Sequence, residues 1–287
     1  MKIVTPKTEV WGMCPTDMDE AILWIERAGR TCYRSEDKIV EGSGAKFVGN
    51  IIKRGHLSVI EHSNLVIRSN ESFKFPKNTL DAIRGSYESK FLYFEVQDDH
   101  VFIGGNFRAW MEELNIPTIE DLFEHQLRTG FSMVRNHNHI PRDLKAVSAE
   151  FLTDRAVTHE FVRHRPCSFS QESQRYCSYK KHLEVILPEH YADIPKTKDN
   201  AQMNRYQGWV QAIEYVEKTY HELLELGERA EQARSVLPNS TATKIVCTAT
   251  AREWDHIFAM RTQAAAYPAI RSLINPVKQH FHEVNLT

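Results

Sequence analysis

The strongest pattern in the 287-residue sequence is a long run of apolar residues at helical spacing in its C-terminal half. Apolar residues that recur every three or four positions line one side of a helix, so the run predicts a helix of about five turns with one packed face. Its members are Tyr206, Trp209, Val210, Ile213, Val216, Tyr220, Leu223 and Leu224. Two shorter helical patterns follow, one through Trp254, Ile257 and Phe258 and one through Ile270, Leu273 and Ile274.

The first half of the chain mixes helical and strand patterns. A helix capped by Thr16 is predicted to end near Tyr33, and a second short helix is predicted to stop at Gly55. Strands are predicted at 64–67, at 183–187 and along the alternation that starts at Val147. We therefore expect an α+β fold with a central, mostly antiparallel sheet and a helical C-terminal half.

Residues 69–146 differ in character from the rest of the chain. Short apolar runs flank Gln97, Asp98 and Asp99, which predicts a hairpin, and a helix through Trp110 is expected to follow. We interpret 69–146 as an insertion within a single domain that spans 1–287.

The charge balance excludes a protein built as a polycation. Lys and Arg number 36 and Asp and Glu number 38, for a formal charge of −2, so any basic site must be local. Between Arg155 and His182, six Lys or Arg residues stand against two acidic ones. Arginine forks with interleaved serine and glutamine side chains suit a nucleotide phosphate, sugar and base edge. We expect no nucleic-acid partner and no membrane partner.

Targeting, cysteine and metal signals are weak. No run approaches the roughly 18 apolar residues of a membrane span, and the N-terminus lacks the apolar core of a signal peptide, so we expect a cytoplasmic protein. The five cysteines are scattered without a C-x-x-C pair, which favours reduced thiols. The pairs His137 with His139 and His280 with His282 lack further ligands at useful spacing, so we predict no metal site.

One fourteen-residue block carries a specific motif. Arg163-His164-Arg165 is followed after seven residues by Ser173 and then by Arg175-Tyr176, which resembles the signature of flavin-dependent thymidylate synthases. The turn 55–62, Gly-His-Leu-Ser-Val-Ile-Glu-His, is similar to a second element of that family, and 230–261 is similar to its C-terminal helices.

The resemblance implies an enzyme for the reductive methylation of dUMP to dTMP. It implies methylenetetrahydrofolate as carbon donor, FAD as redox carrier and NADPH as reductant, with hydride from reduced flavin and no enzyme nucleophile. It also implies a homotetramer whose active sites are shared between subunits.

The resemblance further implies site residues. The catalytic residues are Arg261, at the position that polarises the uracil ring, and His56. The implied substrate-binding residues are Glu160, Arg163, Gln171, Glu172, Ser173, Gln174, Arg175, Arg234 and Arg261. The implied flavin-binding residues are Ser58, Arg163, His164, Arg165, Gln171, Thr250, Arg252 and His256. Helical spacing agrees with two of these pairs, because Glu160 and Arg163 are three residues apart and Arg252 and His256 are four apart.

Other interpretations stay open at this point. Cys167 follows a proline, as the nucleophile of classical thymidylate synthases does, and flanking arginines favour a thiolate. A flavin- and folate-dependent RNA uracil methyltransferase would use the same cofactors. A nucleic-acid-binding module would use the basic block with Phe169, Tyr176 and Tyr179 as stacking platforms.

Overall fold

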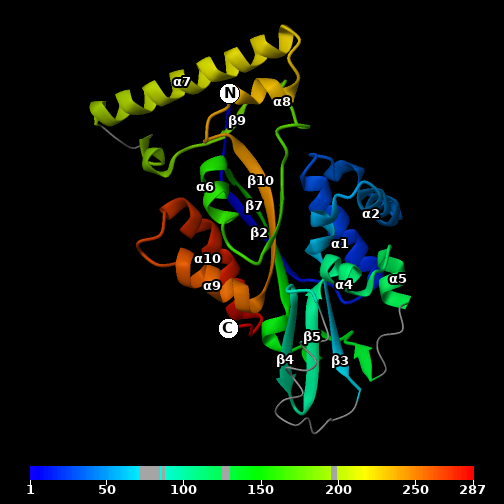
Figure 1. Ribbon diagram of the computed structural model, residues 1–287. Helices are drawn as coiled ribbons and strands as arrows, with labels where there is room; N and C mark the ends of the chain where they lie inside the picture. The colour runs from blue at the N-terminus through cyan, green and yellow to red at the C-terminus, as the bar shows by residue number, and fades with distance from the viewer. Residues whose placement is uncertain (71–84, 86–87, 125–129, 195–198) are drawn as a thin grey trace.

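A computed structural model describes residues 1–70, 85, 88–124, 130–194 and 199–287. The chain forms a central sheet between two sets of helices, a second sheet at one end and a long helix at the other (Figure 1). The expected α+β class, the mostly antiparallel pairing and the helical C-terminal half are all confirmed.

The central sheet has the order β2-β7-β10-β8 and is antiparallel throughout. Its strands are β2 (Lys7–Met13), β7 (Ala146–Asp154), β8 (Ser168–Gln171) and β10 (Ala242–Thr250). The two long central strands pair over nine residues each, from Ala242 opposite Asp154 to Thr250 opposite Ala146. A small parallel pair, β1 (Lys2–Val4) with β9 (Glu184–Ile186), lies beyond this sheet.

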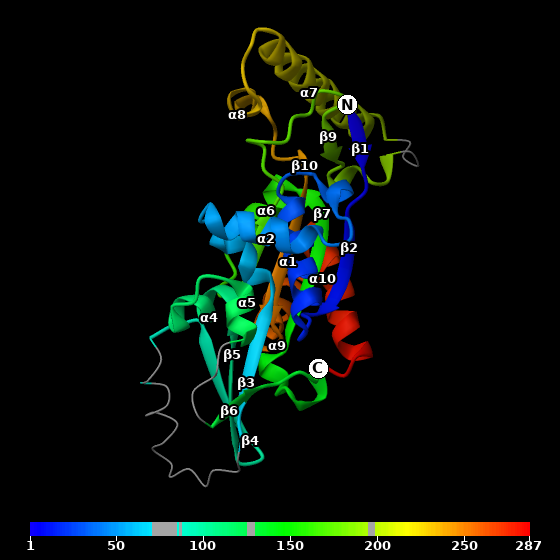
Figure 2. The ribbon, with the colours of Figure 1, turned by 90° about the vertical axis from the view of Figure 1, so that its right-hand side faces the viewer.

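Helices cover both faces of the central sheet. One face carries α6 (Arg155–Phe161), α9 (Ala251–Arg261) and α10 (Pro268–Glu283), and the other faces α1 (Met18–Thr31) (Figures 1 and 2). The alternation in β7 explains the first arrangement, since Val147, Ala149 and Phe151 are buried in one cluster with α6, α9 and α10. Asp154 caps α6, and its side chain accepts a hydrogen bond from the Val157 amide at 2.8 Å.

The first helix begins differently from the prediction. Its cap is Asp17, whose carboxylate accepts hydrogen bonds from the amides of Asp19 and Glu20. The Thr16 hydroxyl instead donates to the carbonyl oxygen of Arg135 at 2.7 Å. A neighbouring residue with an equally good capping side chain therefore sets the boundary.

The second sheet has the order β4-β5-β3-β6. Its strands are β3 (Asn64–Ser69), β4 (Leu92–Gln97), β5 (His100–Asn106) and β6 (Phe131–Met133). Two helices, α4 (Phe107–Leu114) and α5 (Ile119–Glu124), lie between β5 and β6 in the chain. The predicted hairpin is confirmed: Gln97 pairs with His100, and Asp98 and Asp99 both have positive φ, as a two-residue turn between twisted strands requires. This sheet shares one apolar core with α1 and α2 (Ser43–Lys53). That the 69–146 stretch is an insertion stays a prediction, and residues 71–84, 86–87 and 125–129 of it lie outside the described residues.

The predicted long helix is α7 (Asn200–Glu225), followed by the short α8 (Ala230–Ala233). Within its 26 residues only Ile213 and Tyr220 are buried, in a cluster with Tyr179, Leu183 and Val185. It lies at the far end of the molecule from the second sheet (Figures 1 and 2).

All five cysteines are free thiols. No helix in the described part of the chain is long and apolar enough to cross a membrane. Among the residues with described positions, no three His, Cys, Asp or Glu side chains are grouped so that they could hold a metal ion.

The core around Trp254 gives a stability prediction. Trp254 is fully buried, its ring packs against Phe258 and Phe281, and its Nε1 donates to the carbonyl oxygen of Val147 at 3.0 Å. We expect Trp254→Ala to lower the free energy of unfolding by about 3–5 kcal/mol in urea denaturation, because it leaves a cavity. Tyr215, 71% exposed on α7, is the matched control, and Tyr215→Ala should change stability by less than about 0.5 kcal/mol. Equal losses in the two variants would contradict this description of the core.

Candidate functional site

Arg261 is held at the end of α9 by two groups from the α6 region. Its Nη1 donates to Glu160 Oε2 at 2.8 Å, and its Nε donates to His164 Nε2 at 2.9 Å. A third bond runs from Nη2 to the carbonyl oxygen of Glu160 at 3.2 Å. Three bonds to one guanidinium fix its plane, so the cation has a defined direction before any ligand binds.

His164 is the neutral partner in this arrangement. It is only 6% exposed. Burial, followed by the positive charge of Arg261 and the neighbouring His256, lowers the pKa of His164 to about 4. Because Nε2 accepts a hydrogen bond from Arg261, the ring proton must be on Nδ1. His256 precedes Arg261 on α9, and the centre of its ring lies 5.8 Å from the centre of the His164 ring.

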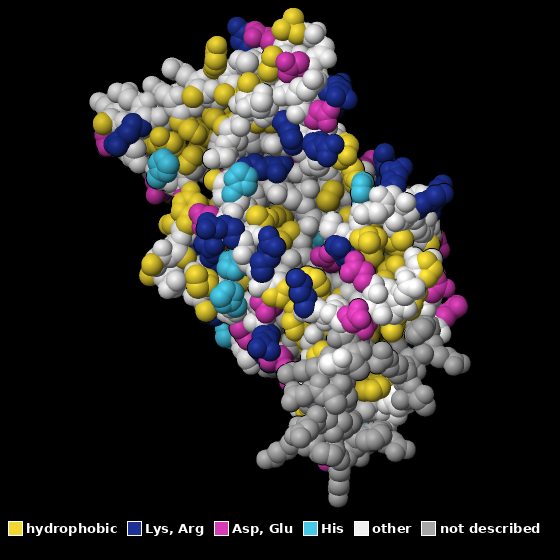
Figure 3. All heavy atoms as spheres, in the orientation of Figure 1, with side chains coloured by type: hydrophobic (Ala, Val, Ile, Leu, Met, Phe, Trp, Pro, Cys, Tyr) yellow, Lys and Arg dark blue, Asp and Glu magenta, His cyan; other side chains and the backbone are white. Residues whose placement is uncertain are grey.

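The remaining arginines of the motif point outward. Arg163 and Arg165 are exposed on either side of the buried His164. Within residues 1–70, 85, 88–124, 130–194 and 199–287, neither forms an ion pair with an acidic side chain. Figure 3 shows Lys and Arg side chains, with His beside them, gathered where α6 and α9 reach the surface. These cations are therefore available to an anionic ligand.

A cavity of about 660 Å³ opens between the two sheets. Its first wall comes from the central sheet and the loop before β8, and includes Val162, Arg165, Cys167, Phe169, Thr248 and Thr250. Its second wall comes from the second sheet and the segments next to it, and includes Glu61, Asn64, Lys90, Phe91, Tyr93 and Asn106. Of the predicted flavin residues, Arg165 and Thr250 line this cavity, and exposed Arg252 lies on the α9 turn just after Thr250.

The 55–62 turn contributes a residue that the site prediction omitted. His56 and Ser58 are exposed and do not line the cavity, whereas Glu61 does. Glu61 accepts hydrogen bonds from Arg108 at 2.9 Å and from Ser168 at 3.2 Å. The signal for Glu61 was present, because it belongs to the motif that contains His56. Arg108, its partner, lies 47 residues further along the chain and has no local signal.

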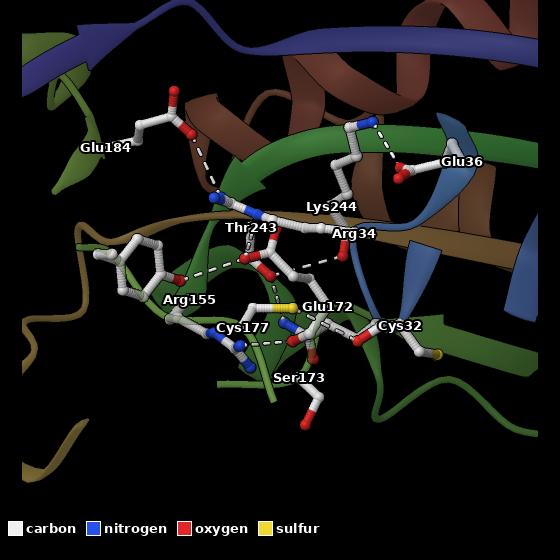
Figure 4. Close-up of polar contacts among 12 residues, drawn as sticks. Cys32, Arg34, Glu36, Arg155, Glu172, Ser173, Cys177, Glu184, Thr243 and Lys244 are labelled. Atoms are coloured by element: carbon white, nitrogen blue, oxygen red, sulfur yellow. Dashed lines mark hydrogen bonds and ion pairs between the residues drawn. The ribbon is translucent and has the colours of Figure 1, made fainter. Parts of the chain in front are cut away.

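The predicted residue Glu172 lies within a second group of polar contacts (Figure 4). The Glu172 side chain is 1% exposed, and its Oε1 lies 2.8 Å from Arg34 Nε. The Tyr179 hydroxyl donates a hydrogen bond to the same oxygen at 3.3 Å. Arg155 donates to the Glu172 carbonyl oxygen at 2.6 Å. Gln171 is also turned inward, toward the hydroxyls of Thr158 and Thr243. These two predicted contact residues are therefore occupied by internal bonds.

Two of the predicted phosphate-binding arginines come together at Glu231. Arg175 Nε lies 3.8 Å from Glu231 Oε2, and Arg234 Nε donates to the Glu231 carbonyl oxygen at 3.2 Å. Both arginines are exposed. Ser173 starts the same turn, its amide bonded to the Cys32 carbonyl oxygen at 3.0 Å, and the Gln174 side chain is half-buried beside it. The predicted residues thus form two groups, one around Arg261 and the cavity and one around Ser173.

The lowered pKa of His164 predicts a pH dependence of stability. An unfolded histidine titrates near pH 6.5, so between pH 4 and 6.5 the unfolded chain binds more protons, and stability must fall as the pH is lowered through that range. We expect wild type to lose about 1–2 kcal/mol more than His164→Gln between pH 7 and pH 5 in urea denaturation. Replacing exposed His139 by Gln should leave the wild-type pH dependence unchanged. The same slope in all three proteins would show that His164 is not held neutral.

Comparison with known proteins identifies relatives of the chain. A family model described as thymidylate synthase complementing protein matches residues 77–285. The flavin-dependent thymidylate synthase of Geobacter sulfurreducens is 30% identical over 162 residues, which is 56% of this chain and 64% of that protein. The flavin-dependent thymidylate synthase of Mycobacterium tuberculosis is 34% identical over 164 residues, 52% of this chain and 60% of that protein.

Solved structures give a weaker likeness. The UMP/dUMP methylase PolB from Streptomyces cacaoi, bound with 5-Br UMP or with 5-Br dUMP, superposes with a TM-score of 0.48 at 14% identity. The superposition covers 99% of this chain and 92% or 93% of the methylase. The family-model match covers most of the sequence, including Glu160, His164 and Arg261, and the chain therefore belongs to the thymidylate synthase complementing protein family.

Proposed function

We propose that the protein catalyses the reductive methylation of dUMP to dTMP, with methylenetetrahydrofolate as carbon donor, FAD as redox carrier and NADPH as reductant. The name of the curated relatives, flavin-dependent thymidylate synthase, supports this activity. The observation that carries it is the guanidinium of Arg261, fixed by Glu160 and a neutral His164 beside Arg163 and Arg165, which form no ion pair within the described part of the chain.

The residues around the cavity fit a flavin. The first wall combines the ring of Phe169 with the cation of Arg165, which suits a planar ring system with an attached diphosphate. We propose that the groups that hold FAD are Ser58, Arg163, His164, Arg165, Thr250, Arg252 and His256, and that Gln171 supports them through its internal bonds to Thr158 and Thr243. When bound, FAD supplies the redox chemistry, including the hydride for the pyrimidine, so the protein needs no nucleophile of its own.

The Ser173 group suits the substrate phosphate. Arg175 and Arg234 approach each other at Glu231, and both stay exposed, so together they can bind a phosphate monoester. Ser173 and Gln174 add neutral donors in the same turn. Gln171 and Glu172 act by positioning this turn, since their side chains are bonded internally.

The chemical task of Arg261 is electrostatic. Carbon 5 of uracil is a poor nucleophile until electron density moves into the ring, and a fixed cation near a ring carbonyl favours that shift. Glu160 and His164 hold the guanidinium in place, so little reorganisation is needed when substrate binds. Glu160 and Arg163 complete the nucleotide contacts, and His56 assists the folate or the flavin from the exposed end of the 55–62 turn.

We also propose a homotetramer with active sites shared between subunits. The predicted residues form two separate groups on one chain, and α7 exposes Tyr215 and the helix-end Leu226 at 71% and 83%. Contacts from a second copy of the chain would bring further residues to each group and cover this apolar surface.

Two arginine variants separate chemistry from flavin binding. Arg261→Ala should retain FAD absorbance while dTMP formation falls by about 10²–10³-fold, because one preorganised cation is lost. Arg165→Ala should weaken flavin retention by about tenfold, measured by dialysis against FAD. Normal turnover in both variants would contradict the proposed function, and methylation of RNA but not of free dUMP would redirect it to a uracil methyltransferase.

Cys167 provides the test of the hydride mechanism. Cys167 lines the cavity. Because no enzyme nucleophile is required, Cys167→Ala should keep dTMP formation within about threefold of wild type. A variant that binds FAD and dUMP but no longer turns over would show that Cys167 attacks the substrate.

A further inference from the structure

The second wall of the cavity comes from a part of the chain that the motifs do not explain. Lys90 and Phe91 lie in the turn before β4, Tyr93 lies at the start of β4, and Asn106 ends β5. All four line the same cavity as Arg165 and Thr250 of the central sheet. A ligand that fills the cavity therefore contacts both sheets.

Hydrogen bonds to the side chains of Glu113 and Ser89 hold the backbone of the turn that carries Lys90 and Phe91. Glu113 of α4 accepts hydrogen bonds from the amides of Glu88 and Ser89 at 3.0 and 2.9 Å. The Ser89 hydroxyl accepts one from the Phe91 amide at 3.3 Å, and the next residue, Leu92, is buried in the core. The backbone of the turn is thus fixed, and its two outward side chains have a defined place at the cavity.

The side chains of this second wall indicate which kind of ligand it can bind. Phe91 is 43% exposed, and Lys90 Nζ lies 5.3 Å from the centre of its ring. No described carboxylate lies within ion-pair distance of Lys90. Glu61, the acidic residue of the cavity lining, is already bonded to Arg108 and Ser168.

Tyr93 adds a neutral donor to the same wall. Burial raises the pKa of Tyr93 to about 12, so its hydroxyl keeps its proton at neutral pH. An apolar ring face, a lysine that pairs with no carboxylate of the described residues and a hydroxyl donor together complement a planar aromatic molecule that carries an anionic group.

We propose that Lys90 and Phe91 bind the anionic aromatic co-substrate of the reaction, Phe91 by stacking on its ring and Lys90 by pairing with its anion. The inference rests on the proposed function and assigns a role to the second sheet within it. Methylenetetrahydrofolate, with its glutamate carboxylates, and NADPH, with its phosphates, share this chemistry. Flavin retention depends on the residues assigned to FAD and not on Lys90 or Phe91.

The test uses Lys90→Glu and Phe91→Ala in the full-length protein. Each should raise the KM for methylenetetrahydrofolate, for NADPH or for both by about tenfold, while FAD absorbance stays at the wild-type level. Equilibrium dialysis with each co-substrate should show the same loss without turnover. A loss confined to one co-substrate identifies that molecule as the ligand, and a loss of both indicates a shared site.

Lys46→Glu is the matched control, since Lys46 is an exposed lysine of α2 outside the cavity lining, and it should behave as wild type. Unchanged affinity for both co-substrates in an active enzyme would overturn the inference alone. Loss of FAD from either variant would also overturn it, because the wall would then belong to the flavin. A wild-type protein that binds neither FAD nor dUMP would contradict the proposed function and the inference together.

Discussion

The antiparallel pairing of β7 with β10 is the constraint on which the site depends. Its nine residue pairs make a ladder about 27–30 Å long, and each strand leads directly into a helix on the same face. Because the strands run in opposite directions, α6 starts at one end of the ladder and α9 at the other. The seven and eleven residues of these helices extend about 10 and 16 Å toward each other. They meet where Arg261 contacts Glu160 and His164.

The charged residues divide into structural pairs and cations that remain free for ligands. Buried Glu172 is neutralised by Arg34, and buried Glu26 by Arg30 at 2.7 Å, because an unpaired carboxylate in the interior would be costly. Near the cavity, Arg163 and Arg165 form no ion pair within the described part of the chain, and Arg175 and Arg234 are exposed beside the Ser173 turn. A net charge of −2 therefore hides a site suited to several anionic molecules.

Much of the fold could be predicted because its signals are local. Residues that lie close together in the sequence predict the alternation in β7, the length of α7 and the two-residue hairpin at Asp98. The contacts that build the site are not local, since His164 and Arg261 are 97 positions apart and Glu61 and Arg108 are 47 positions apart. The site residues themselves came from a family motif, and their roles remain predictions. The cavity wall at Lys90 had no motif, so only the arrangement of the sheets reveals it.

The central claim is that the fixed Arg261 cation and the adjoining cavity serve flavin-dependent methylation of dUMP. The most direct measurement is dTMP formation by the wild-type protein with dUMP, FAD, NADPH and methylenetetrahydrofolate, repeated with each component omitted. We expect a yellow protein that forms dTMP in the complete mixture. We expect dTMP formation to stop when dUMP, NADPH or the folate is left out. A colourless protein that binds no FAD, or one that forms no dTMP in the complete mixture, would contradict it.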